Sequence, residues 1–273
     1  MPLLHALILG FVQGMTEFLP VSSSGHLAVV PWLFGWDDFG ANNALENAFD
    51  VALHLGTLLG AIVYLRSDIV RYSKAALSWV RSSEPPSGDS RIAIFLALTV
   101  IPTGLIGAAA ISFTEDLGDR IWLVGSCLIV FGFVLWIADQ RKVTRGIQEL
   151  TFRHALFLGV VQGLAFQPGV SRSGVTISAF RLLGISRIEA ARLTFLMSLP
   201  VIAGAGLVKA FEVEIPSGWW PPFLVGMGAA AISGWLSVHW LIRLVSRTSF
   251  QGVTIYRVLA GTFVLLLLAS GVR

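Results

Sequence analysis

QGMTEFLPVSSSGH, residues 13–26, interrupts the apolar run at the start of the chain. Glu17 puts a carboxylate into this run, and Pro20 with the serines that follow it ends the run. An ionisable group at membrane depth is costly and marks a functional site by default. The i, i+3, i+4 spacing of Gln13, Thr16 and Glu17 puts all three polar side chains on one helix face. The alternative is a polar contact that packs two helices and does no chemistry.

The same stretch recurs 149 residues later, where residues 154–184 align without gaps on residues 5–35. Fourteen of these 31 positions are identical, whereas biased composition alone would give about two or three. We therefore infer an internal duplication. The informative differences are Glu17 against Phe166, Ser23 against Arg172, and His26 against Val175. One copy keeps an acid, a hydroxyl and an imidazole while the other supplies a guanidinium, which predicts one composite site rather than two equal ones.

The composition is that of an integral membrane protein. Hydrophobic residues make up 55% of the chain, charged residues 13%, and the mean hydropathy is +0.77. Helices satisfy their own backbone groups in lipid, so we expect an α-helical protein. Cys127 is the single cysteine, which excludes an intrachain disulfide and a thiolate metal cluster. The start of the chain lacks a basic segment, and we interpret Leu3–Phe18 as mature protein rather than a signal peptide.

Two segments are too short to cross a bilayer. Leu3–Glu17 has 15 residues, which is about 22 Å of helix against a hydrocarbon core of about 30 Å. A second apolar piece, Leu27–Phe34, follows the polar break. We predict a re-entrant helical hairpin here and another over His154–Leu183, because irregular backbone at membrane depth must be buried in protein or line a cavity. The glycine pairs of these segments are predicted packing contacts: Gly10 and Gly14, Gly159 and Gly163.

Six further apolar segments are predicted to span the membrane. They are Phe49–Leu65, Ile92–Phe113, Ile121–Ala138, Leu193–Val208, Phe223–Ile242 and Ile255–Ala269. The chain is thus predicted to be one membrane domain, residues 1–273, with repeat one at about 1–138 and repeat two at about 152–273. Each half is one hairpin plus three spans.

The loops alternate in charge. Lys and Arg gather in loops 66–91, 139–153, 181–192 and 243–254, which the positive-inside rule places in the cytoplasm. Loops 36–48, 114–120 and 209–222 and both termini are then outside. Three spans per half is an odd number, so the halves are predicted to be inverted relative to each other. Inverted repeats place their site near the midplane, where the broken helices meet.

The two hairpin tips carry groups that suit an anion. Serines stand where the second helix of each hairpin should begin, and a helix N-terminus offers free N–H groups and a positive dipole end. The planar guanidinium group of Arg172 can donate two parallel hydrogen bonds to a phosphate. The alternative is that the serines only cap the helix N-termini and that Arg172 only extends its charged head to the membrane–water interface. The candidate phosphate-binding residues are Ser24, Gly25, Ser171, Arg172, Ser173, Gly174 and Thr176.

Glu17 has two interpretations. It could pair with Arg172 as a structural ion pair, or it could hold Mg²⁺ or Ca²⁺ beside a phosphate through oxygen ligands. His26 is a candidate proton carrier near neutral pH, although a lone histidine is often only a packed residue. Zinc is not expected, because no cluster has zinc-ligand spacing.

In Gln13–His26 and in PGVSRSG, residues 168–174, the chain resembles the undecaprenyl-diphosphate phosphatase family, membrane enzymes linked to bacitracin resistance. The resemblance covers nearly the whole chain in length, hydropathy and motif order. It implies an all-helical polytopic protein of the bacterial plasma (inner) membrane with its site open to the outer face. It also implies removal of the terminal phosphate from undecaprenyl diphosphate, a divalent cation, and return of the product to peptidoglycan and envelope synthesis.

The resemblance also implies roles for individual residues. Glu17 is the acid of an (E/Q)xxxE motif and a candidate metal ligand. Gln13 stands where many relatives have a glutamate, so it is a candidate metal ligand without charge and the site lacks a second carboxylate there. Ser22, Ser23 and His26 belong to the first serine motif, with Ser23 a candidate nucleophile. Arg172 belongs to the second motif, and Asp50 is a candidate second acid. Serine, histidine and water all stay open as the nucleophile.

Two other classes of protein fit part of the pattern. A secondary transporter or lipid flippase shares the inverted repeat with broken helices, but the division of acid, serine and imidazole from arginine favours the enzyme. A structural scaffold leaves the polar tips unexplained. The expected partners are the polyprenyl diphosphate and the membrane, with a second copy of the chain as a further candidate and no nucleic acid.

Overall fold

The computed structural model describes residues 1–40, 42–82, 84–118, 120–212 and 215–271. Within these residues the regular structure is entirely helical. Six helices are long and apolar enough to cross a membrane: α3 Asn43–Val80, α4 Gly88–Gly118, α5 Ile121–Asp139, α8 Arg187–Glu212, α9 Trp220–Val245 and α10 Gln251–Ala269. The predicted all-helical polytopic class is therefore confirmed.

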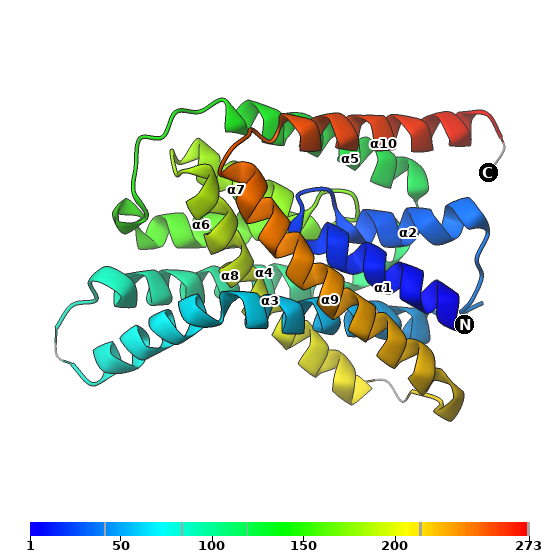
Figure 1. Ribbon diagram of the computed structural model, residues 1–273, viewed down its shortest axis with the longest axis horizontal. Helices are drawn as coiled ribbons and strands as arrows, with labels where there is room; N and C mark the ends of the chain where they lie inside the picture. The colour runs from blue at the N-terminus through cyan, green and yellow to red at the C-terminus, as the bar shows by residue number, and fades with distance from the viewer. Residues whose placement is uncertain (41, 83, 119, 213–214, 272–273) are drawn as a thin grey trace.

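Four shorter helices form two hairpins. The first consists of α1 Leu3–Phe18 and α2 Ser23–Phe34, and the second of α6 Phe152–Gly163 and α7 Arg172–Leu182. In Figure 1 the reversals of both hairpins lie near the middle of the molecule, and both chain termini lie at the same end. The re-entrant placement of the hairpins in a bilayer and the inversion of the halves stay predictions.

Corresponding helices of the two halves have corresponding neighbours. Helix α1 packs on α9 of the other half, α6 packs on α4, and α5 packs on α10. The close approach depends on glycine: a Cβ on Gly10 would lie 2.2 Å from the carbonyl oxygen of Gly226, and one on Gly159 would lie 2.4 Å from that of Thr99. The predicted packing role of these glycines is confirmed, as it is for Gly14 and Gly163, which also lack room for a Cβ.

The boundaries of several helices differ from the prediction. Helix α3 continues to Val80, so the first part of the predicted loop 66–91 is helical. Helix α4 continues to Gly118, which removes most of the predicted loop 114–120. Hydropathy marks where a helix leaves the apolar layer, but polar residues such as Arg66 continue a helix without cost. Residue 119 and residues 213–214 of the predicted outer loops lie outside the described residues.

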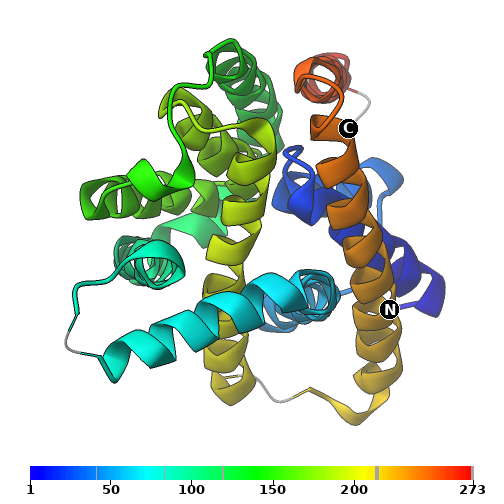
Figure 2. The same ribbon diagram turned by 60° about the vertical axis from the view of Figure 1, so that its left-hand side comes forward.

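Helix α8 runs through the middle of the molecule, as Figure 2 shows. Its buried side chains Phe195, Met197 and Leu199 belong to a large apolar core that also includes Phe18 of the first hairpin and Phe180 of the second. A smaller core joins α1, α3 and α9. These two cores fix both hairpins against the long helices, and they therefore fix the relative position of the hairpin tips.

Candidate active site

Each hairpin breaks for the same local reason. Leu19 and Gln167 both precede a proline and adopt extended backbone with ψ of 137° and 119°, as steric clash with the proline ring requires. The chain then passes through Ser22 and Ser171, which both have φ of +75°. Positive φ in a residue other than glycine costs about 1–3 kcal/mol and is typical of functional sites. The two serines occupy equivalent positions of the duplication, so the strain belongs to the repeated scaffold.

Both strained serines cap the helix that follows. Ser22 Oγ accepts a hydrogen bond from Gly25 N at 3.3 Å, and Ser171 Oγ accepts one from Gly174 N at 3.1 Å. Ser22 Oγ also accepts from Gly169 N at 3.1 Å, which ties the first tip to the second. Ser22 is therefore a connecting residue whose hydroxyl is engaged by two backbone N–H groups.

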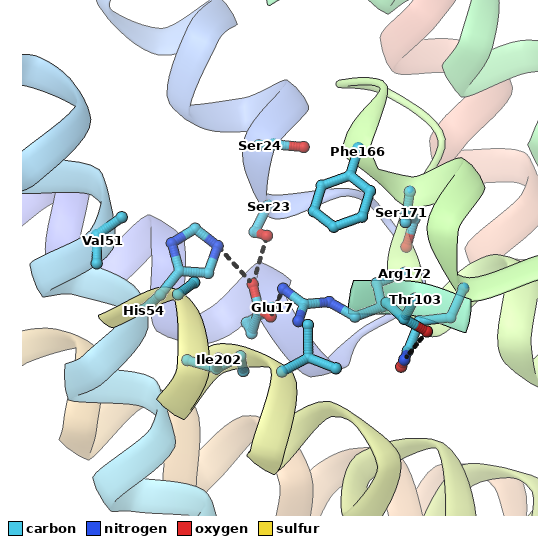
Figure 3. Close-up of a pocket in the computed structure, with 14 residues that line it drawn as sticks. Glu17, Ser23, Ser24, Val51, His54, Thr103, Phe166, Ser171, Arg172 and Ile202 are labelled. Atoms are coloured by element: carbon cyan, nitrogen blue, oxygen red, sulfur yellow. Dashed lines mark hydrogen bonds and ion pairs between the residues drawn. The ribbon is translucent and has the colours of Figure 1, made fainter. Parts of the chain in front are cut away.

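The two copies differ at the first helical residue after each cap. Ser23 begins α2 and Arg172 begins α7. Both side chains meet at Glu17, whose Oε2 accepts from Ser23 Oγ at 2.6 Å and whose Oε1 accepts from Arg172 Nη2 at 3.1 Å. Gln13 Nε2 also donates to Oε2, at 2.9 Å. Figure 3 shows Ser23 and Arg172 converging on the buried carboxylate of Glu17, so the predicted composite site is brought together.

The cluster lines a cavity of about 280 Å³. Five predicted residues face it: Glu17, Ser23, Ser24, Ser171 and Arg172. Apolar side chains from α3, η2 Leu164–Phe166 and α8 complete the wall, among them Val51, Phe166 and Ile202. The cavity therefore has a polar centre that suits a phosphate and an apolar wall that suits a lipid.

His54 was not identified from the sequence. It lies on α3 and lines the cavity, with Nε2 at 3.4 Å from Glu17 Oε2. Its Nδ1 donates to the carbonyl oxygen of Asp50 at 2.8 Å, because a carbonyl can only accept. The sequence feature that could have identified it is a histidine one helical turn after an acid, Asp50, inside a predicted membrane span. Asp50 itself contributes its backbone to this contact and does not line the cavity.

His26 lies elsewhere. Its Nδ1 donates to the carbonyl oxygen of Ser22 at 2.7 Å, and its Nε2 accepts from the hydroxyl of Tyr256 at 2.6 Å. Neither His26 nor Tyr256 lines the cavity. His26 thus stabilises the strained Ser22 turn, and the imidazole that faces Glu17 is that of His54.

Four other predicted phosphate-binding residues support the breaks instead of lining the cavity. Gly25 and Gly174 donate their N–H groups to the caps. Ser173 Oγ donates to the carbonyl oxygen of Leu19 at 3.1 Å, and Thr176 Oγ1 donates to that of Arg172 at 2.7 Å. These bonds join the second tip to the first and fix the start of α7.

Arg257 on α10 is the residue that holds both tips together. Its side chain is fully buried. The guanidinium donates to the carbonyl oxygens of Pro20 and Gly169, each at 2.9 Å, and to those of Val170 and Leu128, each at 3.1 Å. A charged residue in the last predicted span was the signal that the sequence offered.

We expect His26→Ala to lower activity through the Ser22 turn and not through proton transfer. His26→Asn keeps a short donor that can reach the Ser22 carbonyl, so it should recover most of the loss, while neither variant should shift the pH optimum. Rates across pH for both variants test this, with Tyr256→Phe as a matched control that removes only the outer contact. If one side of the bell-shaped pH–rate curve disappears in both His26 variants, His26 takes part in proton transfer and the expectation is wrong.

A hard divalent cation is compatible with the donors at the cavity. No group of three or more His, Cys, Asp or Glu residues in the described part of the chain could hold a metal. However, Gln13 Oε1 is buried and accepts no hydrogen bond from a described residue, while Nε2 of the same amide donates to Glu17. An unpaired buried oxygen next to a carboxylate is what Mg²⁺ or Ca²⁺ uses, with the remaining ligands from water and phosphate.

The fold and the site define a class: a polytopic helical membrane protein with one acid–serine–arginine cavity assembled from two duplicated hairpins. The family described as "Bacitracin resistance protein BacA" matches residues 6–263. The chain belongs to this family, as the resemblance of its two motifs predicted.

Individual relatives match over nearly their full length. A protein of Pelobacter propionicus is 42% identical over 277 residues, which cover 100% of this chain and 99% of the relative. One from Geobacter sulfurreducens is 42% identical over 97% and 98% of the two chains, and one from Nocardioides sp. is 39% identical over 98% and 97%. Each of the three is named "Undecaprenyl-diphosphatase".

Proposed function

We propose that this chain hydrolyses undecaprenyl diphosphate to undecaprenyl phosphate and inorganic phosphate. The observation that carries the proposal is the 2.6 Å hydrogen bond from Ser23 Oγ to a buried carboxylate that also contacts Arg172. A hydroxyl, a base and a phosphate-binding guanidinium in one cavity are the parts that phosphoryl transfer needs. The names of the full-length relatives support this substrate.

The residues of the cavity divide the work. Arg172 and the N-termini of α2 and α7 bind the terminal phosphate, because both offer N–H donors and positive charge. Ser23 Oγ attacks the terminal phosphorus and gives its proton to Glu17, while the bond from phosphorus to the bridging oxygen breaks. Undecaprenyl phosphate leaves, and water then displaces Ser23 from the phosphate. Val51, Phe166 and Ile202 contact the first part of the prenyl chain.

A divalent cation is part of the proposal. Glu17 and Gln13 would hold it, and it would offset the charge of the diphosphate. We also propose the wider setting: a bacterial inner membrane, a cavity open to the outer side, return of the lipid carrier to peptidoglycan synthesis, and a contribution to bacitracin resistance.

Phosphate release by the purified protein tests the proposal. Undecaprenyl and farnesyl diphosphate are supplied with Mg²⁺, with Ca²⁺ and with chelator. We expect release with a divalent cation and none with chelator. Folded protein that releases no phosphate under any condition would overturn the proposal and make lipid translocation the next assay.

A further inference from the structure

A second polar pocket lies where α5 and α9 end and α8 begins, and it shares no lining residue with the cavity. It has a volume of about 460 Å³. Its charged lining residues are Arg141, Lys142, Arg181, Arg187 and Asp139, which gives a formal charge of +3. In Figure 1 the end of α5 and the start of α10 lie away from both termini, toward the end of the molecule where α3 and α4 are joined. This is the end with the basic loops, which is predicted to face the cytoplasm.

The floor of the pocket is an ion-pair network around the buried carboxylate of Asp139. Asp139 accepts from Arg187 Nε at 2.6 Å and Nη2 at 3.0 Å, and it also accepts from the backbone N–H of Phe250 at 3.0 Å. Arg181 lies 3.4 Å from the same carboxylate and donates to the carbonyl oxygens of Ile185, Asp139 and Arg141. One acid thus meets two arginines, so the floor stays positive after pairing.

The rim adds two unpaired cations. The side chains of Arg141 and Lys142 are exposed and have no hydrogen-bond or ion-pair partner among the described residues. Their segment is held in place, because the N–H groups of Thr144 and Arg145 donate to the carbonyl oxygen of Gly184 at 2.9 and 3.2 Å. Free cations on a fixed rim above a positive floor are suited to bind a phosphate.

Apolar side chains stand beside these cations. Val143 is 60% exposed and Ile188 is 38% exposed, and both line the same pocket. Inorganic phosphate has no apolar group that could contact these side chains. A phospholipid does, because its acyl chains lie next to its phosphate. Basic pockets between helices on the cytoplasmic side bind anionic lipid headgroups.

We propose that this basic pocket binds the phosphate of an anionic diacyl phospholipid. The site would join the ends of α5 and α7 to the start of α8, and Asp139 also accepts a hydrogen bond from Phe250, directly before α10. Helices α7 and α10 also carry Arg172 and Arg257. A bound lipid would therefore stabilise the helices that hold the hairpin tips. The proposal does not depend on the phosphatase reaction.

Lipid binding to the full-length protein tests the proposal. Purified protein in neutral detergent receives increasing dioleoylphosphatidylglycerol, and the thermal unfolding midpoint and the lipid retained in native mass spectrometry are measured. We expect saturable stabilisation, with half-saturation shifted on the order of 10-fold higher in the Arg141→Ala/Lys142→Ala protein. Dioleoylphosphatidylcholine should not stabilise the protein.

The control Arg145→Ala/Arg153→Ala removes the same charge from the loop after α5 and the first turn of α6. Both of its side chains are exposed and neither lines the pocket, so its half-saturation should change less than about twofold. If both double variants shift the half-saturation equally, lipid binding depends only on general surface charge and the proposal is overturned. Glycerol phosphate or inorganic phosphate that stabilises the protein as well as the lipid would also overturn it. A loss of lipid binding in Arg172→Ala would place the lipid in the catalytic cavity and contradict the proposal.

Discussion

Arg172→Lys is expected to lower phosphate release on the order of 10²–10³-fold, mainly in kcat. Arg172 Nη2 lies 3.1 Å from Glu17 Oε1, and the side chain also lines the cavity. Its guanidinium can hold the carboxylate with one edge and a phosphate with another. Lysine keeps the charge but has one compact ammonium group, so it cannot do both.

Replacing Arg172 by lysine rather than alanine distinguishes a loss of catalysis from a loss of protein stability. Arg172→Ala would leave Glu17 buried without its partner, and breaking a buried pair costs about 3–5 kcal/mol. Arg172→Lys keeps a cation there, so its unfolding midpoint should stay close to that of the unchanged protein. The matched control is Arg71→Lys, which alters an exposed arginine that donates to Asp89 at 2.5 and 2.7 Å. An Arg172→Lys protein with a third or more of normal kcat would show that charge alone suffices.

The core of the site could be predicted because its parts are local. Glu17, Ser23 and Arg172 stand next to proline-linked breaks in apolar segments, and the duplication aligns Ser23 with Arg172. Two copies of one scaffold that meet must bring those positions together. The structure confirms that they meet at Glu17.

His54 and Arg257 could not be predicted in the same way. Each is a single polar residue in an otherwise apolar span, and such a residue can face a cavity, a neighbouring helix or the membrane interface. Only the packing of α3 against α1 and of α10 against α5 decides which. His26 shows the converse: it follows Ser23 by three residues, yet on α2 it reaches back to the Ser22 carbonyl and away from the cavity.

The ends of the helices also could not be predicted from the hydropathy pattern of the sequence. Hydropathy reports the apolar layer, and it placed the end of the first span at Leu65. Helix α3 instead runs to Val80, because Lys and Arg are good helix formers in water. The spans were therefore predictable, while their extensions outside the apolar layer were not.

Ser23→Ala is expected to abolish turnover, with a loss on the order of 10⁴-fold or more, as for removal of a nucleophile. Ser23 is the cavity hydroxyl that donates to Glu17, at 2.6 Å. Ser24 lines the same cavity one residue later, but its Oγ lies 3.5 Å from Ser22 Oγ and makes no bond to the carboxylate. Ser24→Ala should therefore lose only about 10-fold, the value of one phosphate contact.

A trapping experiment distinguishes Ser23 from water as the nucleophile. Undecaprenyl diphosphate labelled in its terminal phosphate is mixed with excess enzyme and quenched in acid, and the protein is analysed for label. Attack by Ser23 Oγ forms phosphoserine at position 23, because the terminal phosphoryl group passes to the protein before water releases it. The label should be absent from Ser23→Ala and present in Ser24→Ala. If the unchanged protein carries no label at any time while Ser23→Ala keeps slow release, then water is the nucleophile and Ser23 only positions it through Glu17.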